Sequence, residues 1–343
     1  MRKVMGAAVV ALSTLGVAAV AVTVESQNAG AATTAVTVAA DGSGDVTTVQ
    51  AAVDKIASGN TAAVTITIKK GTYSGVVSVP STKPYITFVG ATGTASDVVI
   101  TASRSNSQGY GTAGSATVTL LAKNTTMKNL TVKNGYDESA NGYSQAVALN
   151  ASADRQVFNN IRVIGNQDSL LTWGSTSSVA SRQYFVNSYI EGDVDFIFGN
   201  GTSVFSGCTI KSLTRGSSTN NGYITAASTY ANIKYGLLFV NDTFTTSAPS
   251  NTVYLGRPWH PGSVSGYDPS VVIRDSVLGA HIITAGPWTD MSGFSWKDAR
   301  FYEYNNSGSG ATVNSNRPQL SSSSAASYTA AKYLAGSDGW NPI

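Results

Sequence analysis

The sequence predicts an all-β protein in which short parallel strands coil into a solenoid. Hydrophobic residues make up 42% and charged residues only 12% of the 343 residues, so the chain has enough apolar material for a long core. Gly, Ser, Thr and Asn are abundant, which favours many strands joined by tight turns over a helical bundle. A strand-length segment also recurs along the chain, and such repetition is typical of solenoids.

The recurring segment has the form Phe-x-Asn-x-x-(Val/Ile)-x-Gly, and residues 158–165 and 185–192 match it fully. Including looser copies, the segments begin at Met127, Phe158, Phe185, Phe205, Phe239 and Val272. Because one coil cannot bury its apolar face alone, neighbouring coils should stack. A β-sandwich of hairpins is the alternative, but signals such as Asn-Gly between alternating runs are few.

The N-terminal residues are typical of a secretory signal peptide. A short basic start and an apolar stretch to about Val24 precede small residues at 29–31, where cleavage is expected. A membrane anchor is the alternative, since the apolar stretch is nearly long enough to span a bilayer. We therefore expect a signal peptide at 1–31 and a single secreted, extracellular domain at 32–343 that has no membrane attachment after cleavage.

The charge and the cysteine count narrow the classes of function. Removing Arg2, Lys3 and Glu25 with the signal leaves 20 basic and 18 acidic residues, a balance that does not indicate a nucleic-acid binder. Cys208 is the only cysteine, so no internal disulfide can form and the core must hold the fold together. No CxxC, HExxH or other metal-ligand spacing occurs, so we expect no metal and no cofactor.

Both ends of the domain have patterns typical of short helices. Thr47-x-x-Gln50 has the form of a capping box, and one helical face would then carry Val49, Ala52, Val53 and Ile56. The alanine-rich segment 325–334 favours a second helix. Helices at the ends would cover the open edges of the stacked core, so we expect a monomer.

The repeat brings two carboxylates together. Asp168 lies ten residues after Phe158, and Asp195 lies ten residues after Phe185. In neighbouring coils these side chains would stack roughly 4.8 Å apart. Two carboxylates that close cannot both ionise freely, so the pKa of one should rise. One could then act as a nucleophile and the other as a proton donor.

Other candidates for the chemistry remain. Asp137 satisfies the same register, and Asp193 could share a strand face with the second carboxylate. No Gly-x-Ser-x-Gly motif occurs, and neither His260 nor His281 has an evident serine partner. Cys208 lies in an apolar strand pattern, which favours a buried structural thiol.

Four motifs then follow one another along the chain: QAVAL at 145–149, GNQDSL at 165–170, GDVDFIFG at 192–199 and YLGRPW at 254–259. Together they resemble the signature set of the pectin methylesterase (pectinesterase) family of the bacterial secreted type. The resemblance extends from about Val36 to Asn341. It implies a right-handed parallel β-helix and hydrolysis of the C6 methyl esters of homogalacturonan (pectin), which releases methanol and leaves free galacturonate.

The resemblance also assigns roles to motif residues. Asp195 would be the nucleophile, and Asp168 would be the general acid and then the general base. Gln145 and Gln167 would donate hydrogen bonds to the oxyanion, and Arg257 would orient the nucleophile and keep it ionised. Gln167 and Asp168 are adjacent, and a regular strand would send them to opposite faces. Both can serve one site only if the chain bends there.

The residues expected to bind the sugar chain are Trp259, Phe198, Val194, Thr112 and Ala113. Aspartate at 193 replaces the threonine common in the family, and it could raise the pKa of the nucleophile or repel unesterified galacturonate. Two further functions stay open on this architecture. One is a polygalacturonase-type glycoside hydrolase, which also uses paired carboxylates, and the other is a non-catalytic pectin-binding solenoid.

Overall fold

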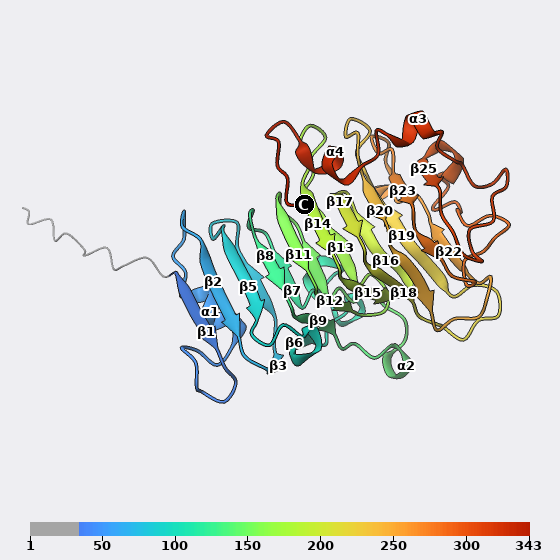
Figure 1. Cartoon of the computed structure of the whole chain (residues 1–343). Coiled ribbons are helices and arrows are strands. Elements are labelled where there is room, and N and C mark those ends of the chain that lie inside the picture. The colour runs from blue at the N-terminus through green and yellow to red at the C-terminus, as the bar shows by residue number, and fades with distance from the viewer. Residues whose placement is uncertain (1–33) are drawn as a thin grey trace, which may run out of the picture. The chain divides into compact units, whose positions relative to one another are not determined.

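The computed structural model describes residues 34–343 (Figure 1), so the predicted signal peptide lies outside the described residues. All its strands belong to three parallel sheets, which we call A, B and C. Sheet A contains β1 (Ala35–Val38), β2 (Val64–Ile68), β5 (Ile86–Gly90), β8 (Thr126–Lys128), β11 (Gln156–Asn159), β14 (Arg182–Val186), β17 (Thr202–Ser206), β20 (Leu237–Val240), β23 (Ser270–Arg274) and β25 (Arg300–Tyr304).

The two other sheets have eight and seven strands in the described part of the chain. Sheet B contains β3 (Gly71–Ser74), β6 (Val98–Ala102), β9 (Thr131–Asn134), β12 (Arg162–Ile164), β15 (Tyr189–Gly192), β18 (Thr209–Ser212), β21 (Thr243–Thr246) and β24 (Val277–Leu278). Sheet C contains β4 (Val77–Val79), β7 (Val118–Leu120), β10 (Leu149–Ala151), β13 (Leu170–Thr172), β16 (Val194–Gly199), β19 (Gly222–Ala227) and β22 (Val253–Gly256).

The helices are short. The α-helices are α1 (Val49–Asp54), α2 (Glu138–Asn141), α3 (Ser322–Ala325) and α4 (Ala330–Ala335). Single 3-10 turns are η1 (Ala95–Asp97), η2 (Asn106–Gln108), η3 (Ala113–Ser115), η4 (Pro261–Ser263) and η5 (Trp296–Asp298). Between residues 34 and 343, none of these is long and apolar enough to cross a membrane.

The chain visits the three sheets in turn, one strand of each per coil, as from β11 through β12 and β13 to β14. Successive coils then pair in parallel within every sheet. This arrangement confirms the predicted parallel β-helix and excludes the hairpin sandwich.

The recurring asparagine marks the corner between sheets A and B. Asn160 separates β11 from β12 with φ 51°, and Asn187 separates β14 from β15 with φ 50°. Asparagine enters this left-handed region more readily than most residues. The Asn160 Nδ2 also donates to the Asn129 Oδ1 of the preceding coil over 2.8 Å. The repeated asparagine therefore marks one left-handed backbone turn in each of these coils.

The recurring phenylalanine forms a stack inside the solenoid. Phe158, Phe185, Phe205 and Phe239 pair in register on successive strands of sheet A. Their ring centroids are 4.3, 4.8 and 4.6 Å apart, with the planes within 14° of parallel. All four side chains are fully buried, so the stack links four coils through the core.

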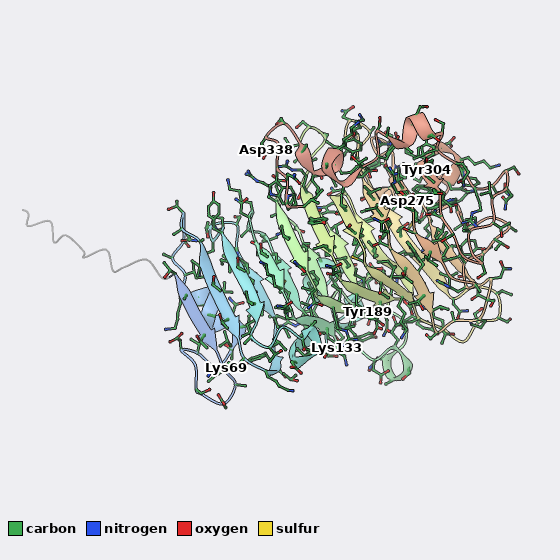
Figure 2. The ribbon with its side chains drawn as sticks, viewed as in Figure 1. Lys69, Lys133, Tyr189, Asp275, Tyr304 and Asp338 are labelled. Atoms are coloured by element: carbon green, nitrogen blue, oxygen red, sulfur yellow. The ribbon has the colours of Figure 1, made fainter. Side chains whose placement is uncertain are left out.

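The last copy of the repeat was predicted one residue too early. Ile273, and not Val272, pairs with Phe239. The corner residue is Asp275, with φ 51°, and its backbone N–H donates to the carbonyl of Tyr304 in the next coil over 2.9 Å. Figure 2 labels both residues, which lie close together. An aspartate at the corner hides the repeat, but it takes the same left-handed turn.

The N-terminal helix starts one residue later than predicted. Thr48, and not Thr47, is the N-cap of α1, and its side chain accepts from the N–H of Ala51. Gln50 is therefore not part of a capping box; its Oε1 accepts from the N–H of Ser78. The helix packs against β1 and β4 and covers the N-terminal end of the core, as expected.

The C-terminal helix covers a face of the solenoid instead of its end. Tyr333 and Leu334 of α4 pack on apolar side chains that point outward from sheet A, namely Tyr184, Val204, Leu238 and Val272. Figure 1 shows α4 alongside sheet A, close to β14 and β17. These outward apolar side chains need cover from water, and this explains the position of the helix.

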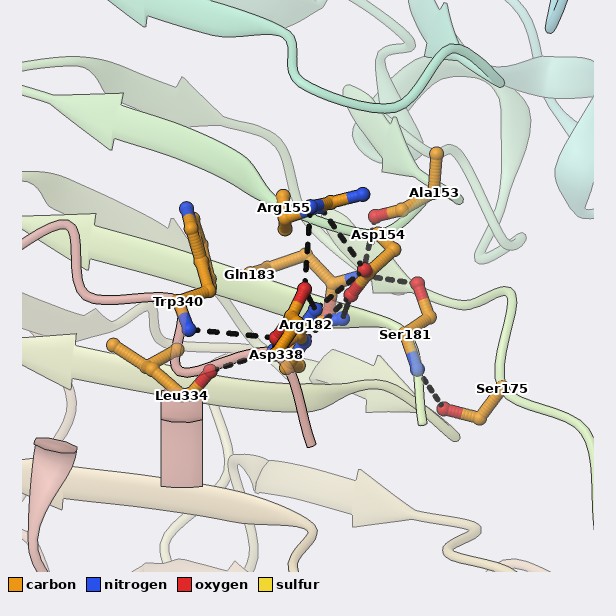
Figure 3. Close-up of polar contacts among 10 residues, drawn as sticks. All are labelled: Ala153, Asp154, Arg155, Ser175, Ser181, Arg182, Gln183, Leu334, Asp338 and Trp340. Atoms are coloured by element: carbon orange, nitrogen blue, oxygen red, sulfur yellow. Dashed lines mark hydrogen bonds and ion pairs between the residues drawn. The ribbon is translucent and has the colours of Figure 1, made fainter. Parts of the chain in front are cut away.

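Arg182 of β14 binds the C-terminal segment that contains α4 and Asp338 (Figure 3). Its guanidinium donates to both carboxylate oxygens of Asp154, at 2.8 and 2.7 Å, and to both of Asp338, at 2.6 and 2.9 Å. It also donates to the carbonyl of Leu334. A nearly buried arginine between two carboxylates is a strong, geometrically fixed contact.

We expect Phe205→Ala to destabilise the protein by about 3–5 kcal/mol, because it leaves a cavity between two stacked rings. Phe205→Leu should cost less than about 2 kcal/mol, because it keeps most of the volume. Urea unfolding followed by circular dichroism measures both. Equal, small effects would show that the stack does not support the core.

We expect Arg182→Leu to loosen the C-terminal segment, since it removes the forked donors between the two carboxylates and leaves Arg155, which lies 3.4 Å from Asp154 and 3.2 Å from Asp338. The loss should be about 1–3 kcal/mol, because both carboxylates are partly solvated. Hydrogen exchange at the amides of α4 should accelerate. Arg162→Leu, which removes an arginine over the Tyr189 ring of sheet B, is the control and should leave those amides unchanged.

Candidate active site

A β-bulge in sheet C positions Asp195. Val194 of β16 pairs with Tyr223, whereas Ile197 pairs with Thr225, so β16 holds one more residue than β19 between these pairs. Asp195 lies in the bulge with φ 51°. Bulges of this kind bend a strand and redirect a side chain. Here the redirected side chain is a buried carboxylate.

Asp168 lies at the matching position of the preceding coil. Leu170 pairs with Ile197, so the two aspartates precede paired residues by the same distance. Asp168 also has a left-handed backbone, with φ 63°, and its N–H donates to the carbonyl of Val194 over 3.0 Å. The left-handed turn supplies the bend that Gln167 and Asp168 need to face one site.

A cavity of about 250 Å³ encloses both carboxylates, and it is lined by Thr112, Gln145, Gln167, Asp168, Asp195, Phe198, Ala226, Arg257, Trp259 and Met291. A second hollow of about 510 Å³ shares three of these residues and is mostly apolar. It is lined by Thr112, Ala113, Leu121, Asn150, Ser152, Leu171, Trp173, Phe198 and Trp259. A cleft therefore runs along the outer face of sheet C.

Arg257 binds Asp195 with two parallel hydrogen bonds. Its Nε donates to Oδ1 over 2.9 Å and its Nη2 donates to Oδ2 over 2.6 Å. The guanidinium also lies 3.9 Å from the centroid of the Tyr223 ring. A forked, charge-assisted contact of this kind fixes the carboxylate in one orientation.

The two carboxyl groups titrate differently. Burial, followed by the nearby Asp195 carboxylate, raises the pKa of Asp168 well above its ordinary value. Burial also raises the pKa of Asp195, but the bound Arg257 opposes this rise. When their environments give two neighbouring carboxyl groups different pKa values, one group tends to carry the proton and the other to be ionised. Asp168 is suited to carry the proton.

A comparison with known families shows which family the chain belongs to. The model of the Pectinesterase family matches residues 35–337. The chain belongs to the pectinesterase family. Its relatives are named pectinesterase, which is a carboxylic ester hydrolase. One of them, from Ralstonia solanacearum, is 39% identical, with 77% of this chain and 76% of the relative covered.

Solved structures of pectin methylesterases show the same fold. The enzyme PemA from Erwinia chrysanthemi is 31% identical, with a TM-score of 0.78 over 91% of this chain and 98% of that one. A pectin methylesterase in complex with a hexasaccharide is similar to the same degree, with a TM-score of 0.78 and 31% identity over 90% of this chain and 98% of that one.

The other carboxylate in the predicted register, Asp137, does not enter the cavity of this pectinesterase. Paired residues of β9 and β12 are 31 positions apart in the sequence, whereas paired residues of β10 and β13 are 21 positions apart. Ten extra residues, including α2, therefore separate β9 from β10 and displace Asp137. It is instead the exposed N-cap of α2, where hydrogen bonds from Ser139 and Ala140 lower its pKa.

The histidines and the cysteine are not placed for catalysis. His281 is fully buried, which lowers its pKa to about 4, and His260 stacks on Phe294 with centroids 3.7 Å apart. Cys208 is buried, as predicted, and burial raises its thiol pKa. Among residues 34–343, no three His, Cys, Asp or Glu side chains gather as metal ligands would.

The aromatic residues of the cleft form one cluster. Trp259 lies 5.7 Å from Phe198 and 5.8 Å from Trp173, centroid to centroid. Thr112 and Ala113 line the cleft as expected, whereas Val194 is buried and lines neither hollow. Sequence reasoning missed Trp173, because no family motif contains it. Its place just after β13, the strand next to Asp168, was the available signal.

Sequence reasoning also missed Arg215, which neutralises Asp193. The Arg215 Nε donates to the Asp193 Oδ2 over 2.7 Å, and Asp193 is only 3% exposed. The nearby Asp193 charge raises the pKa of Asp195, as anticipated, but Arg215 acts in the opposite direction. Asp193 is therefore ion-paired; with Arg215 it lines a separate hollow of about 500 Å³ and not the cavity that holds Asp168 and Asp195.

We expect Asp168→Asn to stabilise the protein, increasingly so as the pH rises. Because the folded-state pKa is raised, Asp168 keeps its proton where the unfolded chain, with a pKa of about 3.9, has lost it. Its contribution to stability is thus full below pH 4 and is lost as the pH rises, by at most ~1.4 kcal/mol per pH unit. Asparagine avoids this loss and tolerates the left-handed backbone.

Thermal melts of both proteins from pH 4 to pH 9 measure this difference. Asp137→Asn is the control, because the pKa of Asp137 is lowered, so its contribution is lost only below about pH 4 and should stay constant over this range. The difference in melting temperature between Asp168→Asn and the unmodified protein should grow with pH. A constant difference over this range would contradict the assignment of a raised pKa to Asp168.

Proposed function

We propose that this protein hydrolyses the C6 methyl esters of homogalacturonan through Asp195 as nucleophile and Asp168 as general acid and base. One observation carries the proposal: a carboxylate fixed by a forked arginine lies in the same cavity as a buried carboxyl group that favours its proton. The family and the match to pectin methylesterase structures support the reaction class.

In the first step, the Asp195 carboxylate attacks the ester carbonyl carbon and forms a tetrahedral intermediate with a negatively charged oxygen. The intermediate collapses to an anhydride between Asp195 and the galacturonate, and the C–O bond to the methoxy group breaks. Asp168 gives its proton to the departing methoxy oxygen, so methanol leaves. Arg257 keeps the nucleophile ionised and oriented until attack.

In the second step, Asp168 is a carboxylate and acts as a base. It takes a proton from water, and the resulting hydroxide attacks the acyl carbon of the anhydride. Collapse of this second intermediate releases the galacturonate acid and restores the Asp195 carboxylate. Asp168 again holds a proton, so the cycle closes without a cofactor.

Gln145 and Gln167 are suited to stabilise the two intermediates. Both line the cavity that holds the carboxylates, and their amide groups are neutral donors. Neutral donors stabilise a developing oxyanion without attracting the nucleophile away from its target. Removal of one oxyanion donor lowers kcat by roughly 10²–10³-fold in other acyl-transfer enzymes.

The cleft supports binding of a sugar chain on either side of the reacting ester. Trp259, Phe198 and Trp173 present aromatic surface that can pack on the apolar faces of pyranose rings. Thr112 and Ala113 line the same hollow, and we keep Val194 as a predicted contact beside the nucleophile. We further infer that the mature protein is secreted and acts as a monomer.

We expect the mature chain to release methanol from methylated pectin without creating new reducing ends. Asp195→Asn should lower this release by at least 10³-fold with little change in stability, since asparagine is isosteric but a poor nucleophile. Asp137→Asn should lower the rate less than twofold. Methanol and reducing-end assays on the same samples separate ester hydrolysis from glycosidic cleavage.

New reducing ends would replace the esterase with a glycoside hydrolase. Pectin binding with no methanol release would indicate a binding protein without catalysis. Activity in Asp195→Asn would show that another group is the nucleophile.

A further inference from the structure

An oxyanion donor of the glutamine type must point the correct end of its side chain at the substrate. The carboxamide of Gln167 carries an acceptor oxygen on one side and a donor NH₂ group on the other. Only the NH₂ group stabilises an oxyanion. A rotation of 180° about the last side-chain bond would instead direct an electron-rich oxygen at the developing charge, so the reaction requires one of two similar orientations.

Arg215 selects between these orientations. Its Nη2 donates to the Gln167 Oε1 over 3.2 Å. A guanidinium has donors only, so it can accept nothing from the NH₂ group. The carboxamide oxygen must therefore face Arg215. The Nε2 of Gln167 donates to no protein group in residues 34–343 and is left for the cavity that the side chain lines.

The guanidinium that makes this contact is itself held from three sides. Asp193 accepts from Nε over 2.7 Å, and Glu138 Oε1 lies 3.6 Å from Nη2. The ring of Tyr143 lies 3.9 Å from the guanidinium carbon. The buried Asp193 and the loop around α2 therefore fix Arg215 in place.

The second proposed donor, Gln145, lacks so selective a partner. Its Oε1 accepts from the Nδ2 of Asn106 over 3.0 Å. Both groups are amides, and a joint rotation of both would reverse donor and acceptor while it keeps the contact. Only the contact from Arg215 has a fixed polarity.

We propose that Arg215 is a positioning residue that orients the Gln167 amide toward the oxyanion. The inference rests on the proposed esterase function and adds to it a residue outside the family motifs. Arg215 acts through Gln167 and not on the reacting atoms, so its effect should be lost when Gln167 has no amide to orient.

A double-mutant cycle with Arg215→Met and Gln167→Ala tests this dependence. Methionine keeps length and apolar contact but donates no hydrogen bond. We expect Arg215→Met alone to lower kcat for methanol release about tenfold or more, with KM changed less than twofold. In the Gln167→Ala background, the same change should lower kcat less than twofold.

The comparison uses kcat on its pH-independent plateau, because loss of the Arg215 charge also raises the pKa of Asp168 and Asp195. Arg162→Met removes an arginine from the surface of sheet B and should leave kcat unchanged. If Arg215→Met folds poorly, Asp193→Asn takes its place, since it weakens the contact that holds Arg215. Its smaller loss of kcat should also vanish with Gln167→Ala.

The outcomes distinguish failure of the positioning role of Arg215 from failure of the oxyanion role of Gln167. If Gln167→Ala lowers kcat but Arg215→Met costs the same factor in both backgrounds, the positioning role is wrong while the oxyanion assignment stands. A rise in KM as the main effect of Arg215→Met would likewise overturn it and indicate direct contact with substrate. If Gln167→Ala leaves kcat unchanged, the oxyanion assignment fails and the positioning role fails with it.

Discussion

The register between neighbouring coils is the constraint on which the rest of this structure depends. Each coil places its residues one strand spacing from their counterparts, and a slip by one residue would turn every side chain of a strand to the opposite face. The stack from Phe158 to Phe239 fills the interior at a single position, and the left-handed corners fix where each strand ends. Asp168 and Asp195 meet because the core beneath them cannot shift.

Much of this could be read from the sequence, because one repeat encodes both the core and the carboxylates. The spacing from Phe158 to Asp168 equals that from Phe185 to Asp195, and the structure keeps it. The bulge at Asp195 could not be read, since Asp-Val-Asp-Phe resembles an uninterrupted strand. Nor could Asp137 be excluded from spacing alone, because the ten-residue insertion shows only when two sheets are compared.

The parts that the sequence hid are those made by distant segments. Arg215 reaches Gln167 across 48 positions, and Arg182 reaches Asp338 across 156. Neither contact follows the period of the coils, so no local sequence pattern predicts it. The same holds for α4, whose apolar residues predict a helix but do not reveal which surface it covers. Contacts that follow the period of the coils can be predicted from a single sequence, whereas contacts between loops are seen only in the structure.

The insertion around α2 separates two properties of the molecule. It lengthens one coil without disturbing the pairing of β10 with β13, and it supplies Glu138 and Tyr143, which contact Arg215 beside the carboxylates. The sheet thus fixes the spacing of the reacting groups, and an independent loop shapes what surrounds them. A change in this loop therefore acts on Arg215, and through it on the Gln167 amide, while the sheet keeps the spacing of the two aspartates.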